Sequence, residues 1–293
     1  MNSPIKKIGL VAKLQSPAAT DALQTLIYHL QRRDLTLMLH QGSVDALPQL
    51  ADLPIVDTVT LGKHSDLIIV VGGDGTLLHT ARLLARYESR VVGINLGRLG
   101  FLADIKPNDM TNDLDAILDG NFIEEKRFLI RATAFRGKTV LARCCAVNDI
   151  VIHKWNTTHL FGFTTHINKC LLGNQRADGV LISTPTGSTA YCLSGGGPIV
   201  HPSLNALILM LLLPHTLSHA PIVLDSNSEI EVTLQLNQDI EAQLTCDGVA
   251  SQTLLPGDRV TIQRHRHVYL IHPPNHDHYA TLRDKLRWGY QPA

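Results

Sequence analysis

The sequence predicts an α/β domain followed by a β-rich domain, and two observations carry this prediction. In the first third, short apolar segments alternate with segments whose apolar residues recur at helical spacing, which favours a parallel sheet with helical crossovers. Beyond about Glu125, short strand-like segments follow one another, many separated by Asn, Gly, Asp or Gln residues, as in hairpin-rich domains. At 293 residues the chain also exceeds one average domain. We therefore expect domains at 1–124 and 125–275, with 276–293 returning to the first.

Strands and helices alternate through the first expected domain. The segment Ala18–Arg33 shows the helical pattern clearly, because its apolar residues lie at the spacing of one helix face. Gly120 stands where a helix over Asp109–Asp119 would end. A further helix is expected over Thr76–Tyr87, and the expected strands are Ile8–Ala12, Leu35–Leu39, Leu67–Val71 and Val91–Ile94.

Short strands fill the second expected domain. They are Leu129–Phe135, Val140–Ala146, Asp149–His153, Phe161–Ile167, Val180–Ser183, Ile230–Leu236, Ile240–Cys246, Arg259–Arg264 and Val268–Ile271. The final stretch, Thr281–Trp288, has a helical pattern and is the part of the chain expected to pack back on the first domain.

Composition excludes several classes of protein. Lys and Arg number 26, as do Asp and Glu, so no net charge attracts nucleic acid or anionic lipid. Five cysteines, an odd count without a CxxC pair, argue against a disulfide scaffold or a zinc ribbon and fit a reducing compartment. The N-terminus lacks the apolar core of a signal peptide, and the most apolar run, Ala206–Leu213, is far shorter than the roughly 20 residues that span a bilayer. We expect a cytoplasmic protein that binds neither nucleic acid nor membranes.

A glycine turn follows the strand Leu67–Val71. Gly72-Gly73-Asp74-Gly75 leads into the helix expected from Thr76, so bare backbone N–H groups lie at the carboxyl edge of the sheet and suit phosphate groups. A carboxylate repels phosphate, so Asp74 makes sense as a base for an attacking hydroxyl, or as a group acting through magnesium. Neither a Walker A nor a GxGxxG sequence is present. The structural alternative is a tight turn in which Asp74 only caps the helix.

Three further segments narrow the choice of acceptor. Asn95–Leu102 follows the strand Val91–Ile94, and Asn148-Asp149 opens another strand. The longest segment runs from Arg176 to Pro198 and contains Thr-Pro-Thr-Gly-Ser-Thr-Ala-Tyr at 184–191, with Thr186 a candidate helix cap. Hydroxyls, bare amides and one aromatic ring at a helix start can hold a nucleoside by hydrogen bonding and stacking.

In order and spacing, these four segments resemble the NAD kinase family, its bacterial members especially, over nearly the whole chain from Ile8 to the region of Trp288. The glycine turn alone is similar to that of lipid kinases and, more distantly, phosphofructokinases, but the lipid kinases lack the 184–191 segment. The resemblance implies a Rossmann-like α/β domain and a β-sandwich-like domain, assembled as a homodimer or homotetramer. It implies transfer of the γ-phosphate of ATP to the 2′-hydroxyl of the adenosine ribose of NAD, with Mg²⁺ or another divalent cation neutralising the phosphates.

The resemblance also assigns roles to residues. Asp74 would be the general base that accepts the proton of the ribose 2′-hydroxyl. Asn148 and Asp149 would bind ribose hydroxyls, since a carboxylate accepts two hydrogen bonds from a vicinal diol. Phosphate contacts are expected at Gly72, Gly73 and Gly75. The expected NAD-binding residues are Asp74, Gly75, Phe101, Asn148, Asp149, His159, Arg176, Asp178, Thr186, Thr189, Ala190, Tyr191, Cys192, Leu193 and Ser194.

Three positions depart from the family pattern. Asp149 replaces the more usual Glu, Ala220 stands where Arg is frequent, and Val249 stands where Gln is common. None of them touches Asp74, so the reaction is expected to survive while affinity or the choice between cofactors differs.

Fifteen histidines raise the question of a metal site. His276 and His278 flank Asp277, and His265 and His267 alternate along a strand pattern, yet spacing supplies no third ligand. No metal-ligating residue is therefore predicted.

Two other functions stay open. A lipid or sugar kinase would fit the glycine turn alone, and a non-catalytic NAD(P)-binding sensor would make Asp149 and Val249 marks of decay. The sequence also leaves open whether ATP or polyphosphate is the donor, whether NADH is accepted beside NAD, and whether NADPH inhibits.

Overall fold

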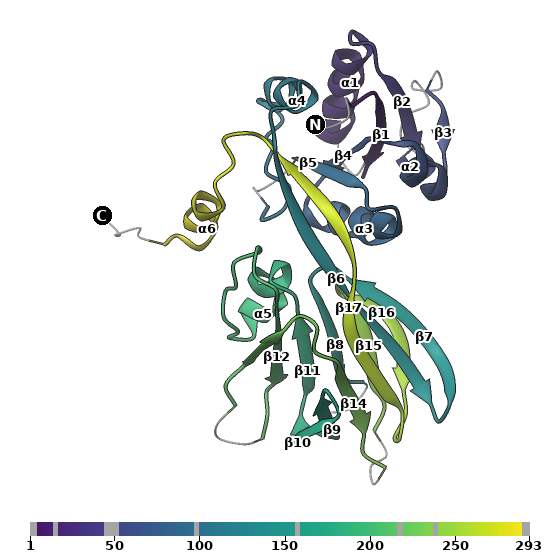
Figure 1. Ribbon diagram of the computed structural model, residues 1–293, viewed down its shortest axis with the longest axis vertical. Coiled ribbons are helices and arrows are strands. Elements are labelled where there is room, and N and C mark those ends of the chain that lie inside the picture. The colour runs from purple at the N-terminus through teal and green to yellow at the C-terminus, as the bar shows by residue number, and fades with distance from the viewer. Residues whose placement is uncertain are drawn as a thin grey trace. The chain divides into compact units, whose positions relative to one another are not determined.

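The computed structural model describes residues 5–13, 17–43, 53–96, 100–155, 159–215, 219–236 and 240–288. It divides into two compact units, one of Met1–Lys126 with His267–Ala293 and one of Arg127–Arg266 (Figure 1). The return to the first unit therefore begins at His267, and the predicted start at residue 276 is wrong. The reason is that the end of strand β17 (Arg259–His272) pairs with β5 of the first unit through Tyr269 and Leu270.

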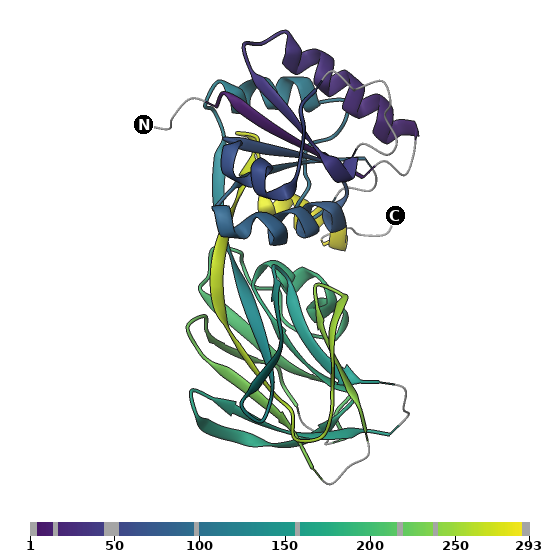
Figure 2. The same cartoon turned by 90° about the vertical axis from the view of Figure 1, so that its right-hand side faces the viewer.

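The first unit is a parallel α/β sheet, as predicted. Its strands follow the order β3-β2-β1-β4-β5-β17, each parallel to its neighbour. Figure 2 shows helices α1 and α4 on one face of this sheet and α2 and α3 on the other. The bounds are β1 Lys7–Ala12, α1 Pro17–Gln31, β2 Thr36–His40, β3 Ile55–Val56, α2 Thr58–His64, β4 Leu67–Gly72, α3 Asp74–Leu84, β5 Arg90–Asn95 and α4 Met110–Leu118.

Local signals explain where these helices start and stop. Gly120 adopts a φ of 87° and ends α4 where the sequence analysis expected it. Helix α2, which was not predicted, begins at a side-chain cap in which Asp57 accepts a hydrogen bond of 2.8 Å from the N–H of Thr60. Helix α6 (His278–Leu286) starts three residues before the predicted Thr281, because Asp277 accepts a bond from the N–H of Tyr279.

The second unit is a β-sandwich. One antiparallel sheet has the order β13-β12-β11-β8-β15-β16, and the other joins β10, β9, β14, β17, β6 and β7. The bounds are β6 Ile123–Arg136, β7 Thr139–Ala146, β8 Asp149–Lys154, β9 Phe161–Ile167, β10 Cys170–Ala177, β11 Gly179–Ser183, β12 Ala206–Leu212, β13 Ile222–Asp225, β14 Ile230–Leu234, β15 Ala242–Cys246 and β16 Val249–Leu254.

Alternation along the strands builds the core of the sandwich. Val180 and Ile182 on β11 point into the main core between the sheets. Leu181, between them, packs instead with Cys192 and residues of β12 on the outer face. Both faces of β11 are therefore buried, which explains why its sequence is a continuous apolar run.

Three details of the second unit differ from the sequence analysis. The two strands predicted at Arg259–Arg264 and Val268–Ile271 form one strand, β17, whose polar middle interrupts the apolar pattern without ending the ladder. Strands β10, β12, β13 and β16 were not predicted. Cys144 on β7 and Cys246 on β15 form a disulfide between residues separated by 102 positions, a pairing that spacing could not reveal. Among the described residues, none of the helices is long and apolar enough to cross a membrane.

Candidate functional site

The glycine turn lies between β4 and α3. Gly73 holds the cap position of α3, and its carbonyl accepts bonds of 3.0 and 3.2 Å from the N–H groups of Thr76 and Leu77. Asp74 is the first residue of the helix, and its side chain turns away from the helix axis toward the segment Phe101–Ala103. The local structure is therefore the predicted strand, turn and helix start, but Asp74 does not act as a side-chain cap.

Three backbone N–H groups bind the Asp74 carboxylate. Phe101 donates to Oδ2 at 2.7 Å, and Leu102 and Ala103 donate to Oδ1 at 3.2 and 3.0 Å. A Cβ on Gly100 would collide with the same carboxylate, so glycine is needed there for close approach. A carboxylate has about four acceptor directions. Asp74 is thus held in a fixed orientation by its own unit and keeps about one acceptor direction for a further hydroxyl.

A cavity of about 280 Å³ lies beside this turn, within the first unit. Gly75 and Thr76 line it together with Lys13, His40 and His79, and its described lining contains no carboxylate. Burial lowers the pKa of His40, and the nearby His79 lowers it further. Burial also lowers the pKa of His79, and the positive charges of Arg82 and Lys13 lower it further. Cationic and hydroxyl side chains at a helix start suit a phosphate-bearing ligand.

A second cavity, of about 810 Å³, lies entirely within the second unit. Six of the predicted residues line it: Asn148, Asp149, Asp178, Ala190, Tyr191 and Ser194. Other lining residues, which the sequence analysis did not single out for this role, are Val151, His153, Lys154, Gly195, Leu212, Leu213, Thr245, Asp247 and Gly248. The structure therefore brings together residues from five parts of the chain around one concave surface large enough for a nucleotide.

Asp247 holds the turn that carries Asn148 and Asp149. Its carboxylate accepts bonds from the N–H groups of Val147 at 3.0 Å, Asn148 at 2.8 Å and Asp149 at 3.2 Å. Asp247 and Gly248 both adopt positive φ, 49° and 73°, which is the backbone of a two-residue hairpin turn between β15 and β16. The Asp-Gly dipeptide is a hairpin signal that could have identified this turn from the sequence.

The hydroxyl-rich segment at 184–191 also binds the turn that carries Asn148 and Asp149. Thr184 donates from Oγ1 to the carbonyl of Val147 at 2.6 Å and from its N–H to the carbonyl of Asn148 at 2.9 Å. Gly187 packs so closely that a Cβ would overlap the carbonyl of Asn148. The Thr-Pro-Thr-Gly sequence thus fixes the position of the Asn148-Asp149 pair.

Polar groups that line the second cavity are available to accept hydrogen bonds from a ligand. Burial raises the pKa of Asp149 to about 7, and the charge of Asp247 adds to this shift. The Oδ1 atom of Asn148 is buried and has no hydrogen-bond partner within the described residues. Asp178, at the same cavity, pairs with Lys154 at 2.7 Å. A bound donor, such as a hydroxyl, would satisfy the first two groups.

The side chains of Thr186 and Cys192 contact other residues of the protein and do not line the second cavity. Thr186 does not cap a helix, contrary to the sequence analysis, but lies in the short 3₁₀ helix Thr186–Thr189, where Arg127 donates to its Oγ1 at 3.2 Å. Cys192 lies in α5 (Tyr191–Ser194) and is fully buried in the outer core. Burial raises the pKa of its thiol to about 11, with the charge of Asp149 contributing.

The remaining predicted residues lie outside both cavity linings. Arg176 is on β10 and exposed, and His159 is exposed before β9. Phe101 lies in the first unit, where the Lys285 ammonium is 5.8 Å from its ring. Of the departures from the family pattern, Val249 and Ala220 are both exposed. Also outside these linings are Gly72, Gly73, Thr186, Thr189, Cys192 and Leu193.

Comparison with known proteins shows similarity to one family along nearly the whole chain. Models of the ATP-NAD kinase N-terminal and C-terminal domains match residues 8–122 and 147–272. The NAD kinase of Nitrosococcus oceani is 44% identical over 290 residues, 99% of each chain. The NAD kinase of Pseudoalteromonas translucida is 41% identical over 290 residues, also 99% of each.

Solved structures share the fold. The yeast NADH kinase complexed with NADH has a TM-score of 0.90 at 23% identity, covering 99% of this chain and 90% of that one. An NAD kinase from Archaeoglobus fulgidus in complex with ATP has a TM-score of 0.72 at 23% identity, covering 96% and 98%. Two matching domain models and relatives of this identity lead to one conclusion: the chain belongs to the ATP-NAD kinase family.

Proposed function

We propose that this protein is an NAD kinase, which transfers the γ-phosphate of ATP to the 2′-hydroxyl of the adenosine ribose of NAD and releases NADP and ADP. The observation that carries this proposal is the sequence identity of 41–44%, over nearly the full length, to proteins named NAD kinase. The two cavities agree with it, because one offers acceptors for ribose hydroxyls and the other offers Lys13 and the start of α3 for phosphates.

Asn148 and Asp149 would bind a ribose of NAD in the second unit. The unpartnered Asn148 Oδ1 and the Asp149 carboxyl provide neighbouring acceptors, which is what a vicinal diol requires. The exposed ring of Tyr191 would stack on a base or on the nicotinamide. Lys154, which is paired with Asp178 in the same cavity, would donate a further ammonium hydrogen bond to the pyrophosphate.

The first-unit cavity would take the phosphates of the donor. Lys13 and the N-terminus of α3 at Gly75 and Thr76 supply positive potential. Since the described lining holds no carboxylate, a divalent cation such as Mg²⁺ would arrive with ATP, bound by the phosphate oxygens. Its charge would neutralise the phosphates during transfer.

Asp74 would be the general base. Its three N–H donors fix its orientation, and its remaining acceptor direction would take the proton of the 2′-hydroxyl. A homodimer or homotetramer in the cytoplasm belongs to the same proposal, and light scattering of the purified protein would report the assembly.

Steady-state assays test the function. The protein would be incubated with ATP, Mg²⁺ and NAD, and NADP would be measured with an NADP-specific dehydrogenase. Crossing ATP and polyphosphate with NAD and NADH in the same assay would define the donor and the acceptor. No NADP under any of these combinations, from protein that is folded by circular dichroism, would refute the proposal.

Asp149 gives the activity a characteristic pH dependence. We expect kcat/KM for NAD to rise through an apparent pKa near 7, because the ionised carboxylate accepts the ribose hydroxyls better than the neutral acid. In Asp149→Asn this rise should be absent and kcat/KM should be low at all pH values. A pH profile that keeps the rise in Asp149→Asn would assign it to another group.

The stability of the protein without NAD should fall over the pH range in which kcat/KM for NAD rises. The pKa of Asp149 is raised in the folded state, so its contribution to stability is fully present below its unfolded pKa near 3.8 and is lost as pH rises through about 7. Asp149→Asn is therefore expected to raise the Tm at pH 8 relative to the wild type while weakening NAD binding. Differential scanning calorimetry at pH 5 and pH 8 would measure this; a lower Tm for the variant at pH 8 would contradict it.

A further inference from the structure

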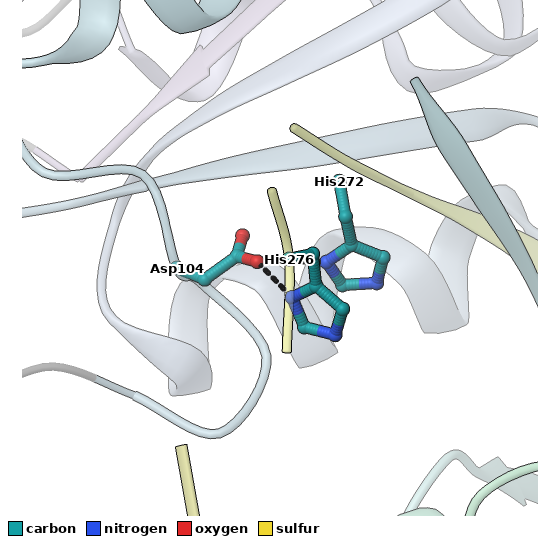
Figure 3. A group of neighbouring side chains, drawn as sticks. All are labelled: Asp104, His272 and His276. Carbon is teal, nitrogen blue, oxygen red and sulfur yellow. Dashed lines mark hydrogen bonds and ion pairs between the residues drawn. The ribbon is translucent and has the colours of Figure 1, made fainter. Parts of the chain in front are cut away.

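A partly buried cluster of Asp104, His272 and His276 lies in the first unit, apart from both cavities described above (Figure 3). One ligand atom from each residue lies within 4.8 Å of the others. The Nδ1 atoms of the two histidines face the same carboxylate oxygen, Asp104 Oδ2, at 2.9 and 2.6 Å. The two rings are stacked, with centroids 4.0 Å apart, so both present the same edge to Asp104.

We propose that Asp104, His272 and His276 form a binding site for a divalent transition-metal ion of the Zn²⁺ class. Two imidazole nitrogens and a carboxylate oxygen are a ligand set that Zn²⁺ accepts, with a further position for water. Zn–N and Zn–O bonds of about 2.0–2.2 Å would require the ligand atoms to stand about 3.3 Å apart in a tetrahedron. The two observed N···O separations, 2.9 and 2.6 Å, would need to widen by about 0.4 and 0.7 Å.

The surroundings of the cluster favour a cation over a set of hydrogen bonds alone. Without a cation, Oδ1 of Asp104 is buried with no hydrogen-bond partner within the described residues. Nε2 of His272 lies 3.4 Å from a carboxylate oxygen of Glu125. If a metal takes Nδ1 of His272, the neutral ring donates its Nε2–H to Glu125, which is the usual carboxylate–histidine–metal arrangement. Oδ1 of Asp104 could then complete a bidentate carboxylate.

A route for the ion is also present. A cavity of about 240 Å³ is lined by Asp104 and His276 and carries four more carboxylates against a single lysine. These residues are Asp109, Asp113, Asp277, Asp284 and Lys106. Such an acidic approach concentrates divalent cations near the ligand atoms.

The position of the site links it to the glycine turn. Asp104 directly follows Ala103, whose N–H binds the Asp74 carboxylate at 3.0 Å. The carbonyl of Ala103 also accepts a bond from Asn95 at the end of β5. A metal bound at Asp104 would therefore fix one end of the segment that orients Asp74, joining it to the end of β17 at His272.

The test uses metal-stripped full-length protein and Zn²⁺ or Co²⁺ alone, so its result does not depend on the proposed activity. We expect about one Zn²⁺ per chain in competition with a chromophoric chelator, and visible absorption bands of four- or five-coordinate Co²⁺. His276→Gln should abolish both signals, and Glu125→Gln should weaken the affinity roughly 10–100-fold. His278→Gln, two residues away on the same segment, is the matched control and should bind like the wild type.

Several outcomes would overturn the proposal. Wild-type protein that binds no Zn²⁺ would do so, as would equal binding in His276→Gln. Equal losses in His276→Gln and His278→Gln would show non-specific binding by the histidines of this segment. Asp104→Asn serves as the second variant, and the Tm of each protein in chelator establishes that it is folded. In folded wild type, Zn²⁺ should raise the Tm, and this rise should disappear in both ligand variants.

Discussion

Asp74→Asn is expected to lower kcat for NADP formation by on the order of 10²–10⁴-fold, the usual contribution of a general base. Asparagine has the same size as aspartate but cannot accept the proton of the ribose 2′-hydroxyl. Steady-state kinetics at saturating ATP and NAD would measure the effect, and the affinity for NAD by calorimetry should change little. Unchanged kcat in Asp74→Asn would remove the assigned role.

The structure adds an alternative that this experiment must separate. Because Asp74 accepts three backbone N–H bonds, its replacement could act by loosening Phe101–Ala103 rather than by removing a base. Hydrogen exchange of that segment distinguishes the two: continued protection together with low kcat supports the base, and lost protection supports the organising role. Asp66→Asn is a suitable control, since Asp66 also accepts two backbone N–H bonds in the same unit, from Lys6 and Lys7.

The sequence predicts elements and turn chemistry well because these are local. The glycine turn at Asp74, the stop of α4 at Gly120 and the opening of β8 at Asp149 all follow from neighbouring residues. Strand β12 illustrates the limit. Its eight-residue apolar stretch excludes a membrane span by its length but does not by itself predict a strand. A short apolar run without alternation does not distinguish a buried strand from other buried segments.

What holds the sites together could not be predicted, because the partners are far apart along the chain. Asp247 lies 98 residues from Asp149, and His272 lies 168 residues from Asp104. No periodicity links such positions, and only the sheet registers bring them together. For the same reason the histidine spacing gave no third ligand, although the fold places Asp104 beside His272 and His276.

Asp247 is the residue whose replacement should affect the second cavity most. In Asp247→Asn the amide nitrogen would face the buried N–H of Val147, leaving a donor against a donor, which costs about 1–3 kcal/mol of stability. The Asn148-Asp149 turn would shift, and we expect NAD affinity to fall at least about tenfold, equal to about 1.4 kcal/mol. Urea unfolding and calorimetric titration with NAD at pH 8 would measure the two effects separately.

The same variant tests the origin of the pH dependence. Burial is the main cause of the raised pKa of Asp149 and the charge of Asp247 is the second, so removing that charge should move the rise in kcat/KM for NAD to lower pH without abolishing it. Asp225→Asn, which replaces an exposed carboxylate of the same unit that accepts a local N–H bond from Asn227, should leave the profile in place. A profile that does not move in Asp247→Asn would mean that the two carboxylates do not interact when NAD binds. In that case Asp247 would serve the cavity only by holding the backbone of the turn.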